Sequence, residues 1–137
     1  MKRKDGKAHK AAKELLGKLI KLLLEALKHE KTRYDAILIL RLIMEYLRDA
    51  LKDKNKKDAV KEVLNTILDQ IVNAFLNKKD REAAKEALRN ILMILMHRFN
   101  KKDAAEILKR IIKRLVSALW KDPKLLEVVM EELKKIK

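Results

Sequence analysis

The sequence predicts an all-α protein, a compact six-helix globule forming a single domain over residues 1–137. Along most of the chain, apolar residues recur every three or four positions, which is the period of a helix with one buried face. The tetrapeptide Asn-Lys-Lys-Asp separates such stretches at 55–58, 77–80 and 100–103. Residues typical of turns are scarce, with two glycines and one proline in 137 residues, against an average usage of roughly 7% Gly and 5% Pro.

The composition favours a soluble protein with a sizeable core. Hydrophobic residues make up 48% of the chain and charged residues 40%, with a net charge of +15. This charge predicts unselective attraction to nucleic acid or anionic lipid, and its self-repulsion predicts a monomer. Because the first apolar cluster is broken by Lys18 and Lys21, we expect no signal peptide and no transmembrane segment, and a cytoplasmic location in an expression host. With no cysteine, the chain has neither a disulfide framework nor a thiolate.

The first predicted helix covers about residues 7–28. Gly17 interrupts it, and glycine inside a helix costs about 1 kcal/mol relative to alanine. Since Gly17 adjoins the apolar face, it predicts a notch where another helix crosses closely. The next helix is expected to start near Thr32 or Asp35, because both residue types cap helices.

The helix at about 32–54 is predicted to be central. Residues 36–47 are apolar at ten of twelve positions. Its polar residues fall on one narrow stripe, so we expect neighbours to cover most of its circumference; they are Arg41, Glu45, Arg48, Asp49 and Lys52. A membrane span is the alternative, but it needs about 20 predominantly apolar residues, and Arg41 and Glu45 interrupt this run.

The repeated tetrapeptide predicts the ends of the next helices. Asparagine tolerates the left-handed conformation that ends a helix, and aspartate caps the helix that follows. Asp122-Pro123 is a further start signal. The predicted helices cover 59–76, 81–99, 104–121 and 123–136. Helix 81–99 holds six consecutive apolar residues at 91–96 and is predicted to be the second central helix, with others packed non-parallel around both. A helical solenoid fits less well, because the helices share no repeated signature.

No catalytic, cofactor-binding or metal site is predicted. His9, His29 and His97 form no metal-ligand spacing,. General acid–base catalysis needs a carboxyl group held in an apolar pocket, whereas the carboxylate pairs lie among lysines on polar faces. These pairs are Glu45/Asp49, Glu82/Glu86 and Glu127/Glu131. Glu45 is expected to form an ion pair with Arg41 or Arg48.

One helix face is a candidate partner site. On helix 104–121, basic residues lie opposite an apolar face, with a tryptophan at the end; the candidate residues are Lys109, Arg110, Lys113, Arg114 and Trp120. A basic amphipathic helix is typical of calmodulin targets and of membrane-surface helices. The other interpretation is that every one-faced helix in so basic a protein has this pattern. Nucleic acid is a further candidate partner, although no familiar nucleic-acid signature is present.

These choices of residue resemble those of de novo designed all-α proteins. The resemblance rests on the connector used three times, the Asp-Pro helix start, polar faces filled with Lys, Glu and Arg, and the near absence of Gly, Ser and Thr within helices,. It covers the whole chain. It implies a protein built to adopt a specified fold, with no evolved biochemical activity, no enzymatic function, no cofactor and no dedicated partner. The alternative function is a basic helical binding module for an acidic partner.

Overall fold

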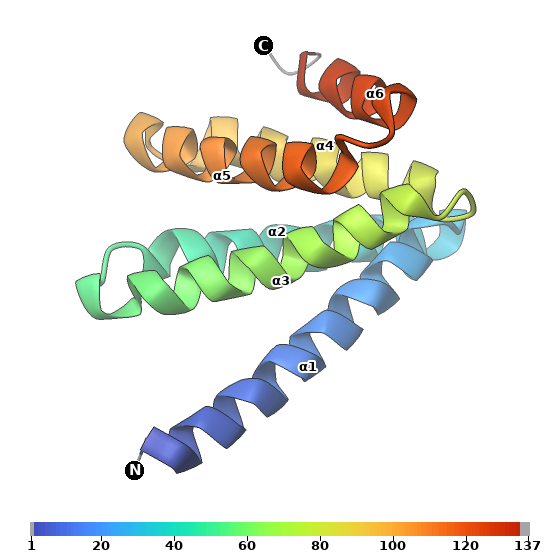
Figure 1. Ribbon diagram of the computed structural model, residues 1–137. Coiled ribbons are helices and arrows are strands. Elements are labelled where there is room, and N and C mark those ends of the chain that lie inside the picture. The colour runs from blue at the N-terminus through green and yellow to red at the C-terminus, as the bar shows by residue number, and fades with distance from the viewer. Residues whose placement is uncertain (1, 135–137) are drawn as a thin grey trace.

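The computed structural model describes the backbone of residues 2–134 and the side chains of residues 10–134. This part of the chain folds into six α-helices and one 3-10 turn, without strands. They are α1 (Lys2–Leu27), α2 (Glu30–Ala50), η1 (Lys54–Lys56), α3 (Lys57–Leu76), α4 (Arg81–Arg98), α5 (Lys101–Leu119) and α6 (Pro123–Lys134). The predicted all-α class and its non-parallel packing are confirmed: α1 crosses α2 and α3 obliquely, and α6 lies at the opposite end of the molecule (Figure 1). Residues 135 and 136 of the last predicted helix lie outside the described part.

α4 is the centre of the fold. It packs against each of the other α-helices. Its first half buries the small side chains of Ala83, Ala84 and Ala87, which allow neighbouring backbones to come close, and its second half buries isoleucine and leucine. The predicted central position of helix 81–99 is confirmed.

α2 is less enclosed than its composition predicts. Its buried residues lie on one face and include Leu40 and Met44, while Leu42 and Tyr46 are 64% and 66% exposed. The expectation that neighbours cover most of this helix is therefore wrong. The reason is that α2 packs extensively only against α1 and α4, so its outer side stays in water. α3, with nine buried residues, takes the second inner position between α1, α4 and α5.

The repeated tetrapeptide separates helices as predicted, and at its second copy α3 ends at Leu76 and α4 begins at Arg81, but its capping bonds differ from the predicted ones in all three copies. In the first, Asn55 lies in η1 and its N–H donates to the Asp53 carboxylate at 2.9 Å. In the second, the Asn77 side chain accepts from the Lys79 N–H at 3.1 Å, and Asp80 precedes α4 without a side-chain capping bond. No described residue has a positive φ, so none of these asparagines adopts the left-handed conformation.

The third copy reverses the predicted roles. Asn100, not Asp103, caps α5, and its Oδ1 accepts from the Asp103 N–H at 2.8 Å. Both residue types can cap a helix, and here the Asn100 oxygen accepts the bond because the helix begins at Lys101. By contrast, the Asp122-Pro123 start is confirmed, because Asp122 accepts from the Leu125 N–H at 3.2 Å.

α2 also begins earlier than expected. Its first residue is Glu30, after His29 in extended conformation and without a side-chain cap. Thr32 instead donates its hydroxyl to the Ala26 carbonyl at 2.7 Å, and Arg33 donates to the Leu27 carbonyl at 3.0 Å. These two bonds tie the start of α2 to carbonyls at the end of α1 and engage the Thr32 hydroxyl there. Asp35 lies inside the helix that begins at Glu30, so neither residue serves as its cap.

Gly17 lies where α1 crosses α3. It is buried, and a Cβ added there would lie 3.4 Å from Nε2 of Gln70 and 4.0 Å from Cγ2 of Thr66. These are ordinary packing distances, so the crossing has room for a methyl group and for little more.

We predict opposite effects for two substitutions at this position. Gly17→Ala gains helix propensity of up to about 1 kcal/mol and fills space beside the flexible end of Gln70, so it should raise Tm by a few degrees. Gly17→Leu adds three further carbons at the crossing and should lower stability by about 1–3 kcal/mol. Thermal unfolding followed by circular dichroism measures both. A leucine variant as stable as the alanine variant would show that the two helices do not meet at Gly17.

Candidate functional site

The apolar face of α5 is already occupied by the rest of the protein. Ile107, Ile111, Leu115 and Leu119 are each at most 5% exposed, and the helix packs against α3, α4 and α6. A calmodulin-like partner grips the apolar face of its target helix. In the folded chain, α5 presents mainly its basic side to a partner, together with the partly exposed Leu108 (37%) and Val116 (39%).

The structure does not gather the five candidate residues into one site. Arg114 pairs with Asp69 of α3, its Nε donating to Oδ1 at 2.9 Å, so its charge is largely compensated. Trp120 is 62% exposed at the end of the helix, where the Lys121 ammonium lies 5.5 Å from its ring centre. Ten residues separate Arg110 from Trp120, a distance of about 15 Å along a helix. Lys113 is exposed.

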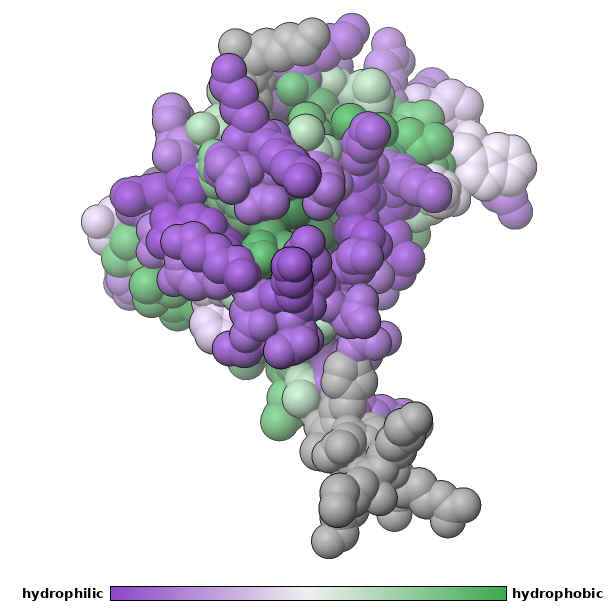
Figure 2. Space-filling view, turned by 90° about the vertical axis from the view of Figure 1, so that its left-hand side faces the viewer, coloured by the Kyte–Doolittle hydropathy of each residue, from purple (hydrophilic) through white to green (hydrophobic). Residues whose placement is uncertain are grey.

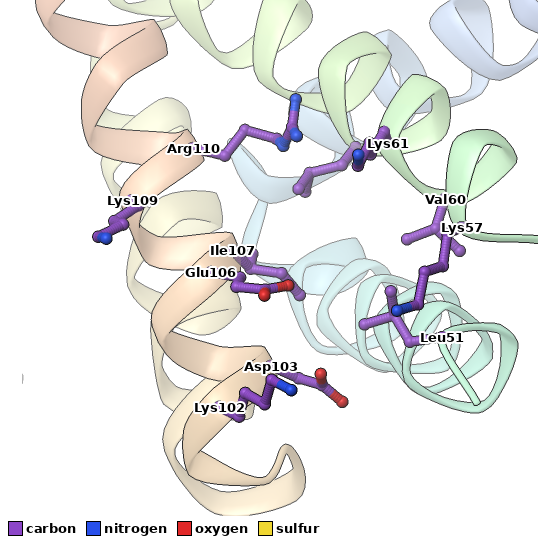
Figure 3. A pocket seen from close by; sticks show the side chains of 11 residues that line it. Leu51, Lys57, Val60, Lys61, Lys102, Asp103, Glu106, Ile107, Lys109 and Arg110 are labelled. Carbon is purple, nitrogen blue, oxygen red and sulfur yellow. The ribbon is translucent and has the colours of Figure 1, made fainter. Parts of the chain in front are cut away.

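Arg110 and Lys109 belong instead to a basic cleft between the starts of α3 and α5. The cleft has a volume of about 370 Å³. Five basic side chains and two acidic ones line it over an apolar floor that includes Val60 and Ile107; they are Lys57, Lys61, Lys102, Lys109, Arg110, Asp103 and Glu106. Figure 3 shows Arg110 and Lys61 extending toward each other across the cleft, while Lys109 points away from it.

The cleft can attract an anion but has weak means of selecting one. Its basic residues outnumber its acidic ones by three, which gives an attractive field for phosphate or carboxylate groups. Lys57, Lys61 and Lys102 are exposed, so salt screens them strongly. Sequence periodicity did not reveal this cleft, because Lys57 and Lys61 lie about fifty positions from Arg110 and only the packing of α3 against α5 brings them together.

The predicted ion pair of Glu45 forms with a different partner. Glu45 lies 3.7 Å from Nε of Arg98, at the end of α4, whereas Arg48 pairs with Asp49 at 3.2 Å. The pairing therefore links α2 to α4. The carboxylates of the Glu82/Glu86 pair contact different basic residues. Glu82 contacts Lys85 at 3.2 Å, and Glu86 contacts Arg89 at 3.4 Å.

The histidines do not converge in the described part of the chain. His29 lies in the turn between α1 and α2, His97 lies near the end of α4, and both are exposed. The side chain of His9 lies outside the described residues. Within the described residues, no group of three histidines or acidic residues could hold a metal ion.

Glu132 is a polar residue whose buried position was not predicted from the sequence. It is 4% exposed and accepts two bonds from Nη2 of Arg89, at 3.1 and 3.3 Å, which tie α6 to α4. The position of Glu132 in the sequence could have predicted this burial. Glu132 follows the buried Val129 by three positions and the buried Leu125 by seven, so it shares their face of the helix.

The Lys28 ammonium, which lies outside the cleft, has a raised pKa. The carboxylates of Asp80 and Glu25 both bond to the Lys28 ammonium and raise its pKa above the ordinary value of 10.5. Because the folded pKa is the higher one, this contribution to stability is fully present below pH 10.5 and is lost as pH rises through the folded value. The Asp80 contact fastens α1 to the start of α4, so Lys28 has a structural role.

Among the helices of residues 2–134, none is sufficiently long and apolar to cross a membrane. Comparison of the chain with protein-family models, curated proteins and solved structures found no match.

We predict that the Arg89–Glu132 pair stabilises the fold more than the Arg114–Asp69 pair does. Glu132 is 5% exposed as a side chain, so Arg89→Ala withdraws a guanidinium from a buried carboxylate and should destabilise by about 1–3 kcal/mol. A double-mutant cycle with Glu132→Gln should give a coupling energy of about 1–2 kcal/mol.

The matched control is the cycle between Arg114→Ala and Asp69→Asn. Both of those side chains are more than 40% exposed, so their coupling should be about 0–1 kcal/mol. Urea denaturation measures both cycles. Equal coupling energies would show that the burial of Glu132 does not strengthen the contact between α4 and α6.

Proposed function

We propose that this chain is a designed helical protein whose role is to hold its helices in the arrangement described above. A protein of this kind has no substrate, cofactor or natural partner that selection has fitted to it, and no enzymatic activity. The proposal rests on the resemblance of the residue choices to designed all-α proteins: one connector used three times, and helices filled with strong helix formers,.

The agreement between local and global structure supports the proposal most directly. The buried apolar residues of the described helices form a single core cluster, and no buried side-chain nitrogen or oxygen in the described part lacks a hydrogen-bond partner. Several polar residues serve the fold itself, as the caps Asn100 and Asp122 do. A sequence specifies one structure when helix propensity, capping, core packing and hydrogen bonding all favour the same fold, and designers choose sequences by this agreement.

A designed origin predicts unusual stability. Idealised helices with high propensity and few strained positions usually give hyperstable proteins. We therefore expect a Tm above about 90 °C or a guanidinium chloride midpoint above about 5 M, in one cooperative transition. Calorimetry and chemical denaturation measure these quantities. A Tm of about 45–65 °C, the range of ordinary mesophilic domains, would contradict the proposal.

A second candidate function is a basic binding module for an acidic partner. The cleft between α3 and α5 favours it, because Lys57 and Lys61 on one helix and Arg110 on the other meet around a space of about 370 Å³. Nucleic acid is the partner that best fits a sequence-tolerant basic surface. A calmodulin-like protein fits less well, because the apolar face of α5 is buried against the core.

Charge-neutralising substitutions distinguish this function from bulk attraction. The variant Lys61→Gln/Arg110→Gln removes two charges from the cleft, and the control Lys113→Gln/Lys124→Gln removes two exposed charges outside it. Binding to fluorescent single-stranded RNA, to duplex DNA and to anionic vesicles is measured from about 0.05 to 0.2 M salt.

The scaffold proposal predicts equal weakening in both variants and the loss of all binding near about 0.15 M salt. A binding module predicts that contact persists at that salt concentration and that only the cleft variant loses affinity, by roughly tenfold or more. Titration with calmodulin, followed by Trp120 fluorescence, should show no change. A saturable change would indicate that calmodulin binds α5 as it binds a target peptide, and it would contradict the scaffold proposal.

A further inference from the structure

The α1–α2 pair carries more exposed apolar side chains than a self-contained surface requires. On α1, Leu15 and Leu22 are each 67% exposed and Leu19 is 40% exposed. On α2, Leu42 is 64%, Tyr46 66% and Ile39 41% exposed. We call these six residues the α1–α2 surface.

The three leucines of α1 form a stripe that faces away from α3. Gly17 marks the direction of α3, because its added Cβ would meet Gln70 and Thr66 of that helix. At about 100° per residue, Leu15, Leu19 and Leu22 lie about 140–200° around the helix from Gly17. None of the three can be covered by α3.

The exposed residues of α2 form a second stripe. They follow one another at spacings of three and four, and they lie about 100–160° around the helix from the buried Leu40,. α1 and α2 pack together and are joined by a turn of two residues, so both stripes belong to one helical hairpin. Figure 2, which views the molecule from the left-hand side of Figure 1, shows hydrophobic residues (green) along its left edge amid a mostly hydrophilic surface.

The size of this surface matches one half of a dimer interface. Taking about 200 Å², the area of an aromatic side chain, as an upper value for each residue, the six residues together expose at most about 700 Å². The largest apolar patch on a typical monomer is about 300–600 Å². A standard interface buries about 800 Å² on each partner.

The charges beside the two stripes suit a copy of the same surface. On α2, Lys31, Asp35 and Asp49 lie within about 20° of Leu42 around the helix, and on α1, Lys18 lies about 40° and Glu25 about 60° from Leu22,. If α1 of one copy lies on α2 of the other, lysine meets carboxylate twice by two-fold symmetry. A self-complementary surface of this kind is what an isologous interface requires.

We propose that the α1–α2 surface binds a second copy of this chain, so that two hairpins form a symmetric four-helix interface. This proposal replaces the expectation of a monomer, which rested on net charge alone. It is independent of the designed origin proposed above, since a designed or a natural chain could associate in this way.

Sedimentation equilibrium tests the proposal, from about 1 to 500 μM chain in 0.3 M NaCl, where the Debye length is about 5–6 Å and net repulsion is largely screened. The wild type should approach twice the 16.1 kDa chain mass as concentration rises. Leu42→Glu and Leu22→Glu should each weaken association at least 100-fold, with unchanged helical circular dichroism, because each places a charge in the apolar interface.

Two control variants show whether the surface is assigned correctly. Val116→Glu alters a 39% exposed residue of α5 and should leave association unchanged. Leu108→Glu places a charge in the apolar groove between α4, α5 and α6, the rival surface, and should also have no effect. A wild type that stays monomeric up to 500 μM overturns the proposal. So does a dimer that Leu108→Glu disrupts and Leu42→Glu does not.

Discussion

The burial of α4 is the constraint on which the rest of the structure depends. A helix that touches every other α-helix of the described chain needs both small and large side chains at its surface. Ala83, Ala84 and Ala87 let helices approach the first half, and Leu88, Ile91 and Leu95 fill the space around the second half. Close-packed interiors tolerate little change of volume, so α4 sets the positions of its neighbours. The oblique course of α1 and the placement of α6 follow from covering this helix from several sides.

The surface has a different character on its different sides. The cleft between α3 and α5 is basic, open and lined by exposed lysines, which gives attraction with little selectivity. The α1–α2 surface is apolar and lies on a helix pair with one side uncovered. A net charge of +15 therefore does not describe every face of the molecule. Association through an apolar face depends on local side chains, whereas attraction to polyanions depends on the sum of charges.

The fold class could be predicted from the sequence because apolar period and helix length are local properties. Residues 91–96 of α4 are apolar without interruption, and four of these six side chains are buried, whereas Met93 and Met96 are 46% and 54% exposed. The same argument failed for α2. Its side chains are apolar around most of the helix, but no other helix packs against its outer side, so Leu42 and Tyr46 remain in water. The capping residue of α5 could not be predicted from residue type, because Asn100 and Asp103 are both able to cap a helix. The geometry of the connector decides between them in favour of Asn100. The cleft could not be found at all, because it unites residues of α3 and α5 that only tertiary packing brings together. Glu132 could have been found, since its spacing from Val129 places it on the buried face.

Native-state hydrogen exchange tests the central position of α4 most directly. Amides in the most enclosed elements exchange only when the whole protein unfolds, whereas those of partly covered helices exchange through smaller openings. If α4 organises the fold, amides from Ala87 to Leu95 should exchange with the free energy of global unfolding, together with those of α3 around Ile67. Amides of α2 near Leu42 should exchange through openings of lower free energy. Slower exchange in α2 than in α4 would contradict the central role of α4, because it would make α2 the organising helix, as its apolar composition predicts.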